Sequence, residues 1–424
     1  MSELRPRAEL RSSGSAVATI ARHGQLPKRR AWPLLLKVMG ATLVVILLSA
    51  GSVGAIVINS LTSKTQTVTI IQATEGPIPE IGAIEGGFNI LIVGSDSREN
   101  SGGIGGSVED ESAVLNDVNM LLHVSQDQTN AVAISFPRDM VVGIPECPWD
   151  DGSGDTKGYS TEPLNVALYY GGLNCVAMTI SELTGLPIQF AGIITFEGVI
   201  KMSDAIGGVD VCITGPMIDP YTGINLPAAG TYKLQGFEAL AFLRSRHGVG
   251  DGSDLTRISS QQVYLSSLVR TLKSADTLSD PKKLYNLAAA ALESMKLSTS
   301  LANASTMVSI ALALKDIPLE RVTFVQYPGA TGGTGIYAGK VRPLTETGDA
   351  MMALIAADQP FVLSAAGDDT GSTADPNAPV PDPNATSDPT EAPVDNTGLP
   401  VVEGVRGQTA ANYTCSITQE AYAD

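Results

Sequence analysis

Residues 88–98 of the chain read FNILIVGSDSR. The run from Phe88 to Gly94 is mostly apolar and β-branched and closes on a glycine, which predicts a buried strand that ends in a turn. Open α/β sheets place their ligands beside such turns, at the carboxyl ends of strands. Asp96 offers an oxygen ligand for a hard cation and Arg98 a partner for an anion, although Gly-Ser-Asp is also ordinary turn sequence.

Strand-like and helix-like segments alternate along the rest of the chain. Apolar runs at 118–125 and 130–136 flank the polar residues 126–129, which predicts a β-hairpin. We also expect strands at 189–195 and 209–213, and helices at 164–184 (with a break near Gly171-Gly172), 196–206, 234–244, 254–275 and much of 281–314. This alternation indicates an α/β layered domain.

The charge of the chain is strongly acidic but unevenly spread. It has 44 acidic and 27 basic residues and a net charge of −17. Eight of the basic residues but only Glu3 and Glu9 of the acidic ones lie before residue 38, so the remainder is more acidic than the whole. Binding of nucleic acid needs a broad basic face, so the main domain is not expected to bind it.

A long apolar segment follows the basic tail. Val38 to Ile58 is 21 residues without a charge, and about 20 residues suffice for a helix to cross a bilayer. Ser49-Ala50-Gly51 would also suit a cleaved signal peptide, but the basic tail and the apolar run are both long for one. Basic residues before the segment place the N-terminus in the cytoplasm. We therefore expect a single-pass cell-membrane protein whose main domain is extracytoplasmic.

Composition divides the chain further. Residues 364–400 are rich in Asp, Pro, Thr, Ala and Asn and cannot bury a core, so we expect them to be disordered. The expected parts are a cytoplasmic tail (1–37), a transmembrane helix (38–58), an extended spacer (59–86), the main domain (87–363), this linker (364–400) and a short C-terminal segment (401–424).

All four cysteines follow the apolar segment, on the side of a membrane where disulfides persist. Three pairings are possible, and the spacing alone does not choose between them. A bond between Cys147 and Cys175 would close a short loop, which makes it the first expectation and leaves Cys212 with Cys415. Four free buried thiols are the alternative, and no cysteine spacing suits a zinc site.

Three arginines gather within fourteen residues of this acidic chain: Arg244, Arg246 and Arg257. Each offers a planar, permanently charged fork that matches two phosphate oxygens at once. The cluster therefore indicates a focused anion site. His247, beside the arginines, is expected to assist with the anion or to pack locally.

The helix predicted from Asp254 has an unusual inner face. At 100° per residue, Asp254, Arg257 and Gln261 lie on the face that carries leucines in the later turns. Buried charges are costly unless they are paired or face a pocket. A structural ion pair at the helix start is the simpler reading, but the nearby arginines favour the rim of a pocket.

Two further polar positions lie at strand ends. Asp117 directly precedes the run at 118–125 and can supply a second carboxylate for a cation held by Asp96. Two carboxylates together with substrate phosphate oxygens are a common Mg²⁺ site. Arg138 follows the run at 130–136 and adds an arginine at what is expected to be the same sheet edge, unless it only forms a surface ion pair in a turn.

Taken in order, these pieces resemble the LytR–CpsA–Psr family of cell-wall glycopolymer ligases. Each piece is short, but the ordered series from Phe88 to Leu272 is specific. The pieces are residues 88–98, Asp117-Val118-Asn119-Met120-Leu121, Ser135-Phe136-Pro137-Arg138-Asp139, Leu164-Asn165 with Tyr170-Gly171-Gly172, Asp204-Ala205-Ile206-Gly207-Gly208-Val209, Arg244-Ser245-Arg246-His247, and Asp254-Leu255-Thr256-Arg257 through Gln261.

The resemblance implies a central mixed β-sheet between helical layers and an apolar tunnel for a polyprenyl chain. It also implies that Asp96 and Asp117 hold Mg²⁺ (or Mn²⁺) and that Asp254 orients the arginines. The groups implied to grip a lipid-linked pyrophosphate are Arg98, Arg138, Arg244, Arg246, Arg257 and Gln261. Family members often carry an arginine two residues before the metal-binding aspartate, where this chain has Leu115. The apolar region 164–183 is a candidate lining for the tunnel, with an ordinary hydrophobic core as the alternative.

The activity implied is transfer of a glycan phosphate from a polyprenyl-pyrophosphate carrier to a hydroxyl of a cell-wall acceptor, either peptidoglycan or a surface protein. Phosphoryl transfer depends mainly on charge neutralisation and positioning, which suits several arginines and a metal ion. Two alternatives stay open. The protein could hold the lipid without turnover, as an envelope-binding or regulatory protein, or it could release the glycan phosphate to water as a pyrophosphatase.

Overall fold

The computed structural model describes residues 66–70, 86–95, 114–149, 156–273, 281–302, 304–378 and 396–419, with a few helical positions between 32 and 42. The chain separates into two compact units, residues 1–57 and 58–424, and the fold below is that of the second. Most of the transmembrane helix expected at 38–58 lies outside the described residues. Within them, no helix combines the length and the apolar character that spanning a bilayer requires.

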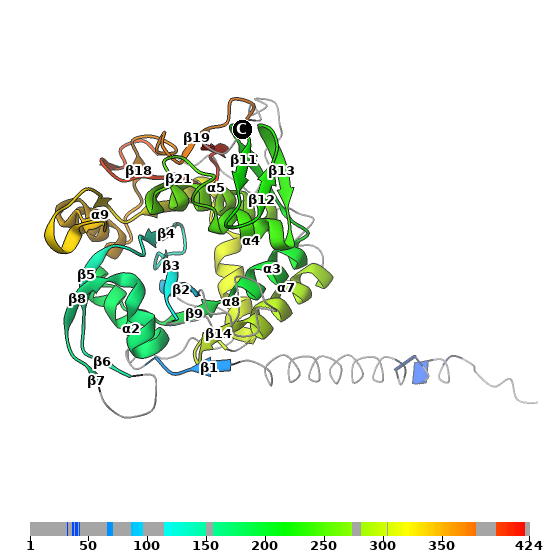
Figure 1. Cartoon of the computed structure of the whole chain (residues 1–424). Helices are drawn as coiled ribbons and strands as arrows, with labels where there is room; N and C mark the ends of the chain where they lie inside the picture. The colour runs from blue at the N-terminus through cyan, green and yellow to red at the C-terminus, as the bar shows by residue number, and fades with distance from the viewer. Residues whose placement is uncertain are drawn as a thin grey trace, which may run out of the picture. The chain divides into compact units, whose positions relative to one another are not determined.

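An eight-stranded mixed sheet forms the centre of the second unit (Figure 1). The strand that follows the spacer, β2, lies inside it, between a parallel neighbour (β9) and an antiparallel one (β3). The order across the sheet is β1 (Gln66–Val68), β14 (Met295–Ser298), β9 (Phe190–Ile194), β2 (Phe88–Ser95), β3 (Asn116–Val124), β4 (Ala131–Phe136), β15 (Val322–Gln326) and β21 (Gly407–Thr409). The predicted α/β class, central mixed sheet and β3–β4 hairpin are confirmed.

Two strands at one end of the sheet differ from the expectation. β14 lies inside the stretch 281–314 that was predicted as mainly helical, and it separates α7 (Pro281–Ser294) from α8 (Ala304–Lys315). β1 lies inside the predicted spacer and pairs with β14 in parallel. Segments of three or four residues are too short to show the period of a strand or a helix. These strands form because β9 offers an edge to β14, which in turn offers its other edge to β1.

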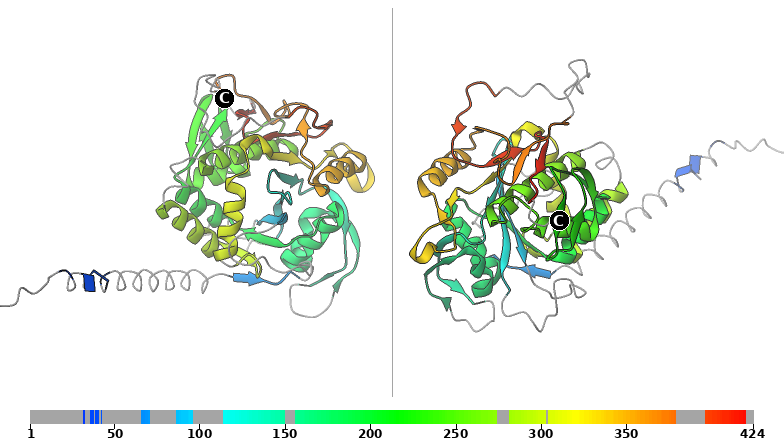
Figure 2. Two further views of the ribbon diagram at one scale, coloured as in Figure 1. Left: turned by 180° about the vertical axis from the view of Figure 1, so that it is seen from behind. Right: turned by 45° about the horizontal axis from the view of Figure 1, so that its top comes forward.

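Helices cover both faces of the sheet (Figures 1 and 2). α2 (Ala167–Thr184) lies on one side, and α3 (Phe196–Ile206), α7 and α8 lie on the other. The break expected in the first of these helices is present, because Gly171 and Gly172 have non-helical backbone angles. The main hydrophobic core lies between α2 and the sheet, where Leu91 and Ile134 are fully buried.

A second, four-stranded sheet lies beside α5 (Asp254–Lys273). Its order is β13 (Gly230–Leu234), β10 (Val209–Ile213), β22 (Thr414–Ser416) and β19 (Ser372–Ala374). The disulfide between Cys212 and Cys415 joins β10 to β22, and a second joins Cys147 to Cys175, so both expected pairings are confirmed. The C-terminal segment therefore folds back onto the domain (Figure 2).

The presence of β19 corrects the linker prediction, because residues 372–374 lie within the segment expected to be disordered. Its composition is indeed too polar to form a core, but an edge strand needs only backbone pairing, which β22 supplies through Ser372 and Ser416. The C-terminal strands also bury the outer face of α5, where Ser259 and Ser266 are 2% and 0% exposed. That helix is thus buried on two sides rather than one.

The remaining elements are short or peripheral. They are the strand pairs β5 (Val141–Ile144) with β8 (Ser160–Pro163), β6 (Cys147–Pro148) with β7 (Thr156–Lys157), β11 (Met217–Asp219) with β12 (Ile224–Leu226), β16 (Gly329–Ala330) with β17 (Arg342–Pro343) and β18 (Val362–Leu363) with β20 (Val401–Val402), the helices α4 (Gly236–Arg244) and α9 (Thr345–Ala356), and the 3₁₀ turns η2 (Leu164–Val166), η3 (Leu319–Arg321) and η4 (Gly335–Tyr337).

Candidate functional site: an apolar cavity with an arginine mouth

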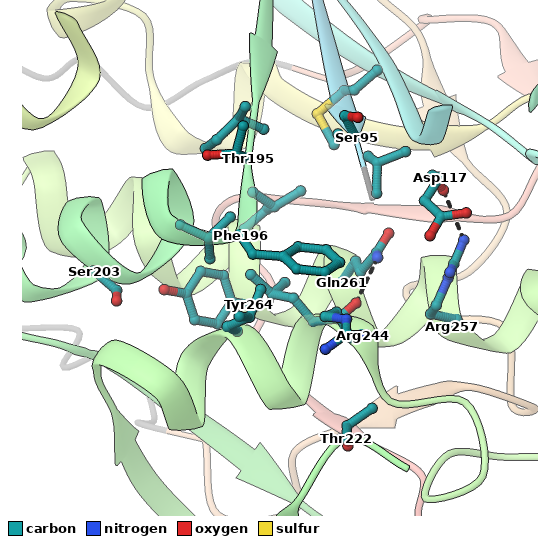
Figure 3. Close-up of a pocket in the computed structure, with 18 of the residues that line it drawn as sticks. Ser95, Asp117, Thr195, Phe196, Ser203, Thr222, Arg244, Arg257, Gln261 and Tyr264 are labelled. Atoms are coloured by element: carbon teal, nitrogen blue, oxygen red, sulfur yellow. Dashed lines mark hydrogen bonds between the residues drawn. The ribbon is translucent and has the colours of Figure 1, made fainter. Parts of the chain in front are cut away.

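A cavity of about 560 Å³ lies between the central sheet and helices α3, α4 and α5 (Figure 3). Its interior is mainly apolar. The apolar side chains that line it are Ile92, Val118, Met120, Ile194, Phe196, Val199, Met202, Ile206, Leu240, Leu243, Leu265 and Leu268. This volume is within the range of pockets that enclose small organic ligands.

The alternation of side chains along β2 explains where the cavity lies. Leu91 and Val93 point into the core under α2, whereas Ile92 and Gly94 line the cavity on the opposite face. The region 164–183 therefore lies on the wrong side of the sheet to line the cavity, and its buried residues belong to the main core. The expectation that this region lines a lipid cavity is wrong, and the ordinary-core alternative is right.

The polar residues of the lining come from distant parts of the sequence. Those with charged or amide groups are Asp117, Arg138, Asp219, Arg244, Arg246, His247, Arg257 and Gln261. We call the part of the lining formed by the four arginines the arginine mouth. Six of them were predicted site residues, and Asp254 joins them through its contacts with Arg138 and Arg257. Asp96 and Arg98 lie outside the described residues. The roles of all these residues toward a ligand stay predictions.

Asp254 is the carboxylate that holds two of the arginines. Its Oδ1 lies 2.5 Å from Nη2 of Arg257, and its Oδ2 accepts a hydrogen bond of 3.2 Å from the backbone N–H of Arg138. Asp254 and Arg257 are each 5% exposed, so this is a buried ion pair as the simpler sequence reading supposed. The same pair also borders the cavity, because Arg257 lines it. Both readings of the helix start therefore apply.

Glycines set the start of α5. Gly250 and Gly252 have positive φ angles of 47° and 78°, which non-glycine residues rarely adopt. A side chain at Gly250 would also collide with the backbone oxygen of Thr370. The turn that they form lets Asp254 begin the helix directly beside the arginine mouth.

Asp117 joins the start of β3 to the same group. Its carboxylate accepts a hydrogen bond from Nη1 of Arg138, and its backbone oxygen accepts one of 2.9 Å from Nη2 of Arg257 (Figure 3). Burial lowers the pKa of Arg138, but the carboxylates of Asp117 and Asp254 outweigh it and raise this pKa overall. The position two residues before Asp117 is Leu115, which is half-buried and has no guanidinium group. The guanidinium that reaches Asp117 is that of Arg138.

Arg244 and Gln261 meet at the C-terminal end of α4. The guanidinium of Arg244 lies 4.2 Å from the ring centre of Phe196, which is the first residue of α3. The side-chain amide of Gln261 donates a hydrogen bond of 2.8 Å to the backbone oxygen of Leu243. Gln261 therefore also holds α5 against α4, beside any contact that it makes with a ligand.

Arg246 differs from Arg138 and Arg257 in its surroundings. Among the described residues, no carboxylate forms an ion pair with it, and its buried Nε has no hydrogen-bond partner. Burial and the positive charges of Arg138 and Arg257 lower its pKa. Asp254 and Asp139 offset these effects only in part, so a bound polyanion would relieve the remaining repulsion.

Asp219 is a positioning residue that sequence analysis missed. It is 1% exposed, and its Oδ2 accepts hydrogen bonds from Oγ of Ser245 (2.8 Å) and from the backbone N–H groups of Arg246 and His247 (both 3.2 Å). These bonds hold the segment between α4 and α5 that presents the arginines. The surrounding residues, Asp219-Pro220-Tyr221-Thr222-Gly223, are ordinary turn sequence, so no local signal distinguishes this aspartate.

Replacing Asp219 by asparagine is expected to weaken the binding of inorganic pyrophosphate by about tenfold, because an amide oxygen is a weaker acceptor and the arginine segment loosens. Isothermal titration calorimetry would measure the change. Asp210→Asn, which alters an exposed aspartate of β10, is the matched control and should bind like the wild type. Equal affinity in both variants would contradict the assigned role.

Comparison with known proteins agrees with this architecture. The model of the LytR_cpsA_psr family matches residues 56–351. The chain is 31% identical over 294 residues to the cell wall biosynthesis protein LcpA of Corynebacterium glutamicum, covering 62% of this chain and 54% of the relative. It is 25% identical over 324 residues to the polyisoprenyl-teichoic acid–peptidoglycan teichoic acid transferase TagT of Bacillus subtilis, covering 74% of this chain and 92% of the relative.

A solved structure shares the fold. The LytR-Csp2A-Psr enzyme from Actinomyces oris superimposes with a TM-score of 0.51 at 22% identity, covering 69% of this chain and 96% of that one. The chain spans about half the length of the two corynebacterial relatives that it matches.

Proposed function

Because the chain belongs to the LytR_cpsA_psr family, we propose that it is a membrane-anchored phosphotransferase that moves a glycan phosphate from a polyprenyl-pyrophosphate carrier to a hydroxyl of the cell wall. The observation that carries the proposal is a single cavity with an apolar interior and an arginine mouth. A lipid with a pyrophosphate headgroup has the same division of polarity. The acceptor is peptidoglycan or a surface protein.

The step follows from the arrangement of charges. An acceptor hydroxyl oxygen forms a bond to the glycan-linked phosphorus, the bond from that phosphorus to the oxygen of the polyprenyl phosphate breaks, and the hydroxyl proton passes to water. The leaving polyprenyl phosphate gains negative charge. Arg244, Arg246 and Arg257 stand where they would neutralise it, while Asp254 keeps Arg257 in place.

The residues at the mouth also suit a magnesium ion. The carboxylate of Asp117 lines the cavity and is 24% exposed, so a hard oxygen donor faces the place proposed for the phosphates. Mg²⁺ is commonly bound by one or two carboxylates together with substrate phosphate oxygens. We propose that Asp117, with Asp96, holds the ion, which would supply further neutralisation of phosphate charge.

The direct test uses the full-length protein in detergent, a polyprenyl-pyrophosphate-linked glycan and purified peptidoglycan, with and without Mg²⁺. We expect polyprenyl phosphate to be released and the glycan to appear on the peptidoglycan, with a lower rate after the metal is chelated. Glycan phosphate that appears only in solution would instead indicate a pyrophosphatase. Tight lipid binding without release of polyprenyl phosphate would indicate a binding or regulatory protein.

Filling the cavity should block long lipids selectively. Val199 lines the apolar interior, so Val199→Trp is expected to raise KM for a donor with a full polyprenyl chain at least tenfold, since each methylene excluded from an apolar site costs about 0.8 kcal/mol. A donor with a single isoprene unit should react as with the wild type, which also shows that the variant is folded. Val199→Leu is the matched control, and equal KM values for the long donor in both variants would contradict the proposed lipid site.

A further inference from the structure

An aromatic cluster lies where β6 meets α2, outside the cavity. It consists of Trp149, Tyr169 and Tyr170, and we call it the α2 aromatic cluster. The ring of Trp149 stands nearly perpendicular to both tyrosines, at 90° and 88°, with ring centres 6.1 and 5.6 Å apart. The two tyrosine rings are 5.7 Å apart. The three rings thus hold one another in fixed orientations.

The backbone beneath the cluster is rigidly built. The disulfide between Cys147 and Cys175 ties the strand that precedes Trp149 to α2. Gly171 allows the close approach, because a side chain there would meet the backbone oxygen of Pro148 at 2.5 Å. The disulfide and the glycine thus fix the position of Trp149 relative to α2.

An ion pair of described residues borders the cluster. Oη of Tyr170 donates a hydrogen bond of 2.6 Å to Glu162, whose carboxylate lies 3.6 Å from Nζ of Lys157. The same ammonium group lies 4.5 Å from the ring centre of Tyr170 and covers that ring. Tyr169 is left open to solvent, with 51% of its surface exposed. Within the described part of the chain, the Glu162–Lys157 pair thus borders an aromatic surface that Tyr169 leaves open.

The cluster is joined to the arginine mouth through η2. The backbone N–H of Asn165 donates a hydrogen bond of 3.0 Å to the backbone oxygen of Arg138, and the side chain of Asn116 donates one of 3.1 Å to Leu164. Tyr169 lies four residues after Asn165, a helical rise of about 6 Å. A polymer of several sugar units would be long enough to reach both places.

We propose that Trp149 and Tyr169 form a platform for a glycan strand of N-acetylhexosamine units, which presents its hydroxyl to the arginine mouth as the acceptor. The identity of the strand as acceptor rests on the proposed transferase function. Sugar rings carry apolar C–H faces that pack on aromatic rings, and hydroxyl edges that bond to groups such as Glu162 and Lys157.

A membrane surface is the competing occupant, since exposed Trp, Tyr and Lys also occur at bilayer interfaces. The composition of this face argues against it. Tyr169 and Tyr159 are its exposed large side chains among the described residues, and no exposed leucine, isoleucine or phenylalanine accompanies them on β5–β8 or α2. Helices that insert into a bilayer surface bring large aliphatic or phenylalanine side chains with them.

The chain offers a direct reporter of binding. It has two tryptophans, Trp32 and Trp149, so Trp32→Phe in the full-length protein leaves Trp149 as the sole tryptophan. Titration with the hexamer of β-1,4-linked N-acetylglucosamine is expected to change its fluorescence with saturation. Tyr169→Ala in this background should weaken the binding about tenfold, because a stacked ring contributes roughly that factor.

The control variant is Tyr413→Ala, which removes a tyrosine of comparable exposure (42% against 51%) from a segment outside α2. It should bind the hexamer as the parent does. Three results would overturn the platform: no saturable signal with the hexamer, equal binding by Tyr169→Ala and its parent, or a signal that appears with phosphatidylglycerol vesicles but not with the hexamer. A lower melting temperature of Tyr169→Ala with unchanged binding would show that the cluster serves packing alone.

Transfer assays separate this proposal from the proposed function. Tyr169→Ala should raise KM for the glycan acceptor about tenfold, with kcat at saturating acceptor and KM for the lipid donor unchanged. A wild-type protein that binds the hexamer through Tyr169 but transfers nothing would support the platform and contradict the transferase. A protein that transfers glycan with the same acceptor KM in both variants would support the transferase and overturn the platform.

Discussion

Replacing Arg246 by alanine is expected to lower kcat/KM for glycan transfer by two to three orders of magnitude, about 3–4 kcal/mol of transition-state stabilisation. The melting temperature should stay unchanged or rise slightly. This combination follows from the surroundings of Arg246, which forms no ion pair with a carboxylate among the described residues. The positive charges of Arg138 and Arg257 outweigh the more distant attraction of Asp254 and Asp139.

The reason lies in the sign of the pKa shift. Burial and the neighbouring cations lower the pKa of Arg246 in the folded protein, so folding disfavours its protonated form. Its charge therefore gains little stability from folding, although Asp254 and Asp139 offset part of the unfavourable effect. A bound polyanion reverses this unfavourable effect, because each phosphate charge attracts the guanidinium groups of Arg138, Arg246 and Arg257.

Two controls sharpen the test of Arg246. Arg246→Lys keeps the charge but loses the planar fork, and should recover only part of the activity. Arg406→Ala removes an arginine that is 44% exposed and paired with the buried carboxylate of Asp368. Asp368 keeps its hydrogen bonds from Ser259, Gly371 and Ser372, so this variant should change neither activity nor stability strongly. If Arg246→Ala lowered the melting temperature by many degrees and kept its activity, the arginine would be a structural group and not an anion ligand.

Removing the disulfide between Cys212 and Cys415 by paired serine substitutions is expected to destabilise the protein by up to about 5 kcal/mol and to abolish transfer. The two cysteines are 203 residues apart, so the bond restricts the unfolded chain far more than one that closes a short loop. Thermal unfolding followed by circular dichroism would measure the loss.

The effect on activity comes through α5. The C-terminal segment that this disulfide tethers supplies the partners for the outer face of that helix. Ser416 bonds to Ser260, Gln408 bonds to Gln262 and Ser266, and the backbone oxygens of Ala410 and Asn412 accept hydrogen bonds from Arg270. Without the tether the helix that carries Asp254, Arg257 and Gln261 loses one of its two supporting surfaces.

The second disulfide provides the matched control. Cys147 and Cys175 are only 28 residues apart, so the same pair of serine substitutions should cost roughly 3.5 kcal/mol at most. It supports α2 and not α5, so KM for the lipid donor should stay near that of the wild type at temperatures where the variant is folded. Greater loss of stability from this second pair than from the first would contradict the role given to the C-terminal tether.

Local patterns were enough to predict the elements with strong signals. The helix at 196–206 and the strand at 209–213 were predicted with the observed boundaries, because Thr195 caps the helix and Gly207 ends it with a left-handed backbone. β14 and β19 were not predicted, since each is short and forms only where a neighbouring strand offers a free edge. Sequence periodicity carries no information about that edge.

The residues of the candidate site also divide into those that local sequence predicts and those that it does not. Five arginines, three carboxylates and one glutamine could be named from the sequence, because charged groups in strand-end turns and on an inner helix face have few structural explanations. Asp219 could not, because its importance comes from three hydrogen bonds to residues 26 to 28 positions away. The side of the sheet on which the cavity lies could not be predicted from the sequence either. The expectation that residues 164–183 line the cavity was wrong for that reason.

The sequence by itself determined the α/β class, the disulfide candidates and the chemistry of the mouth, since these depend on residue types and local periodicity. Only the tertiary structure decided that Arg138, Arg246 and Arg257 share one mouth, with two of them held by Asp254 and the third without a carboxylate partner among the described residues. Only it placed the apolar cavity behind them, on the face of the sheet opposite α2. The physical reason is that charge repulsion and packing depend on distances between residues far apart in the chain, which spacing along the sequence does not contain.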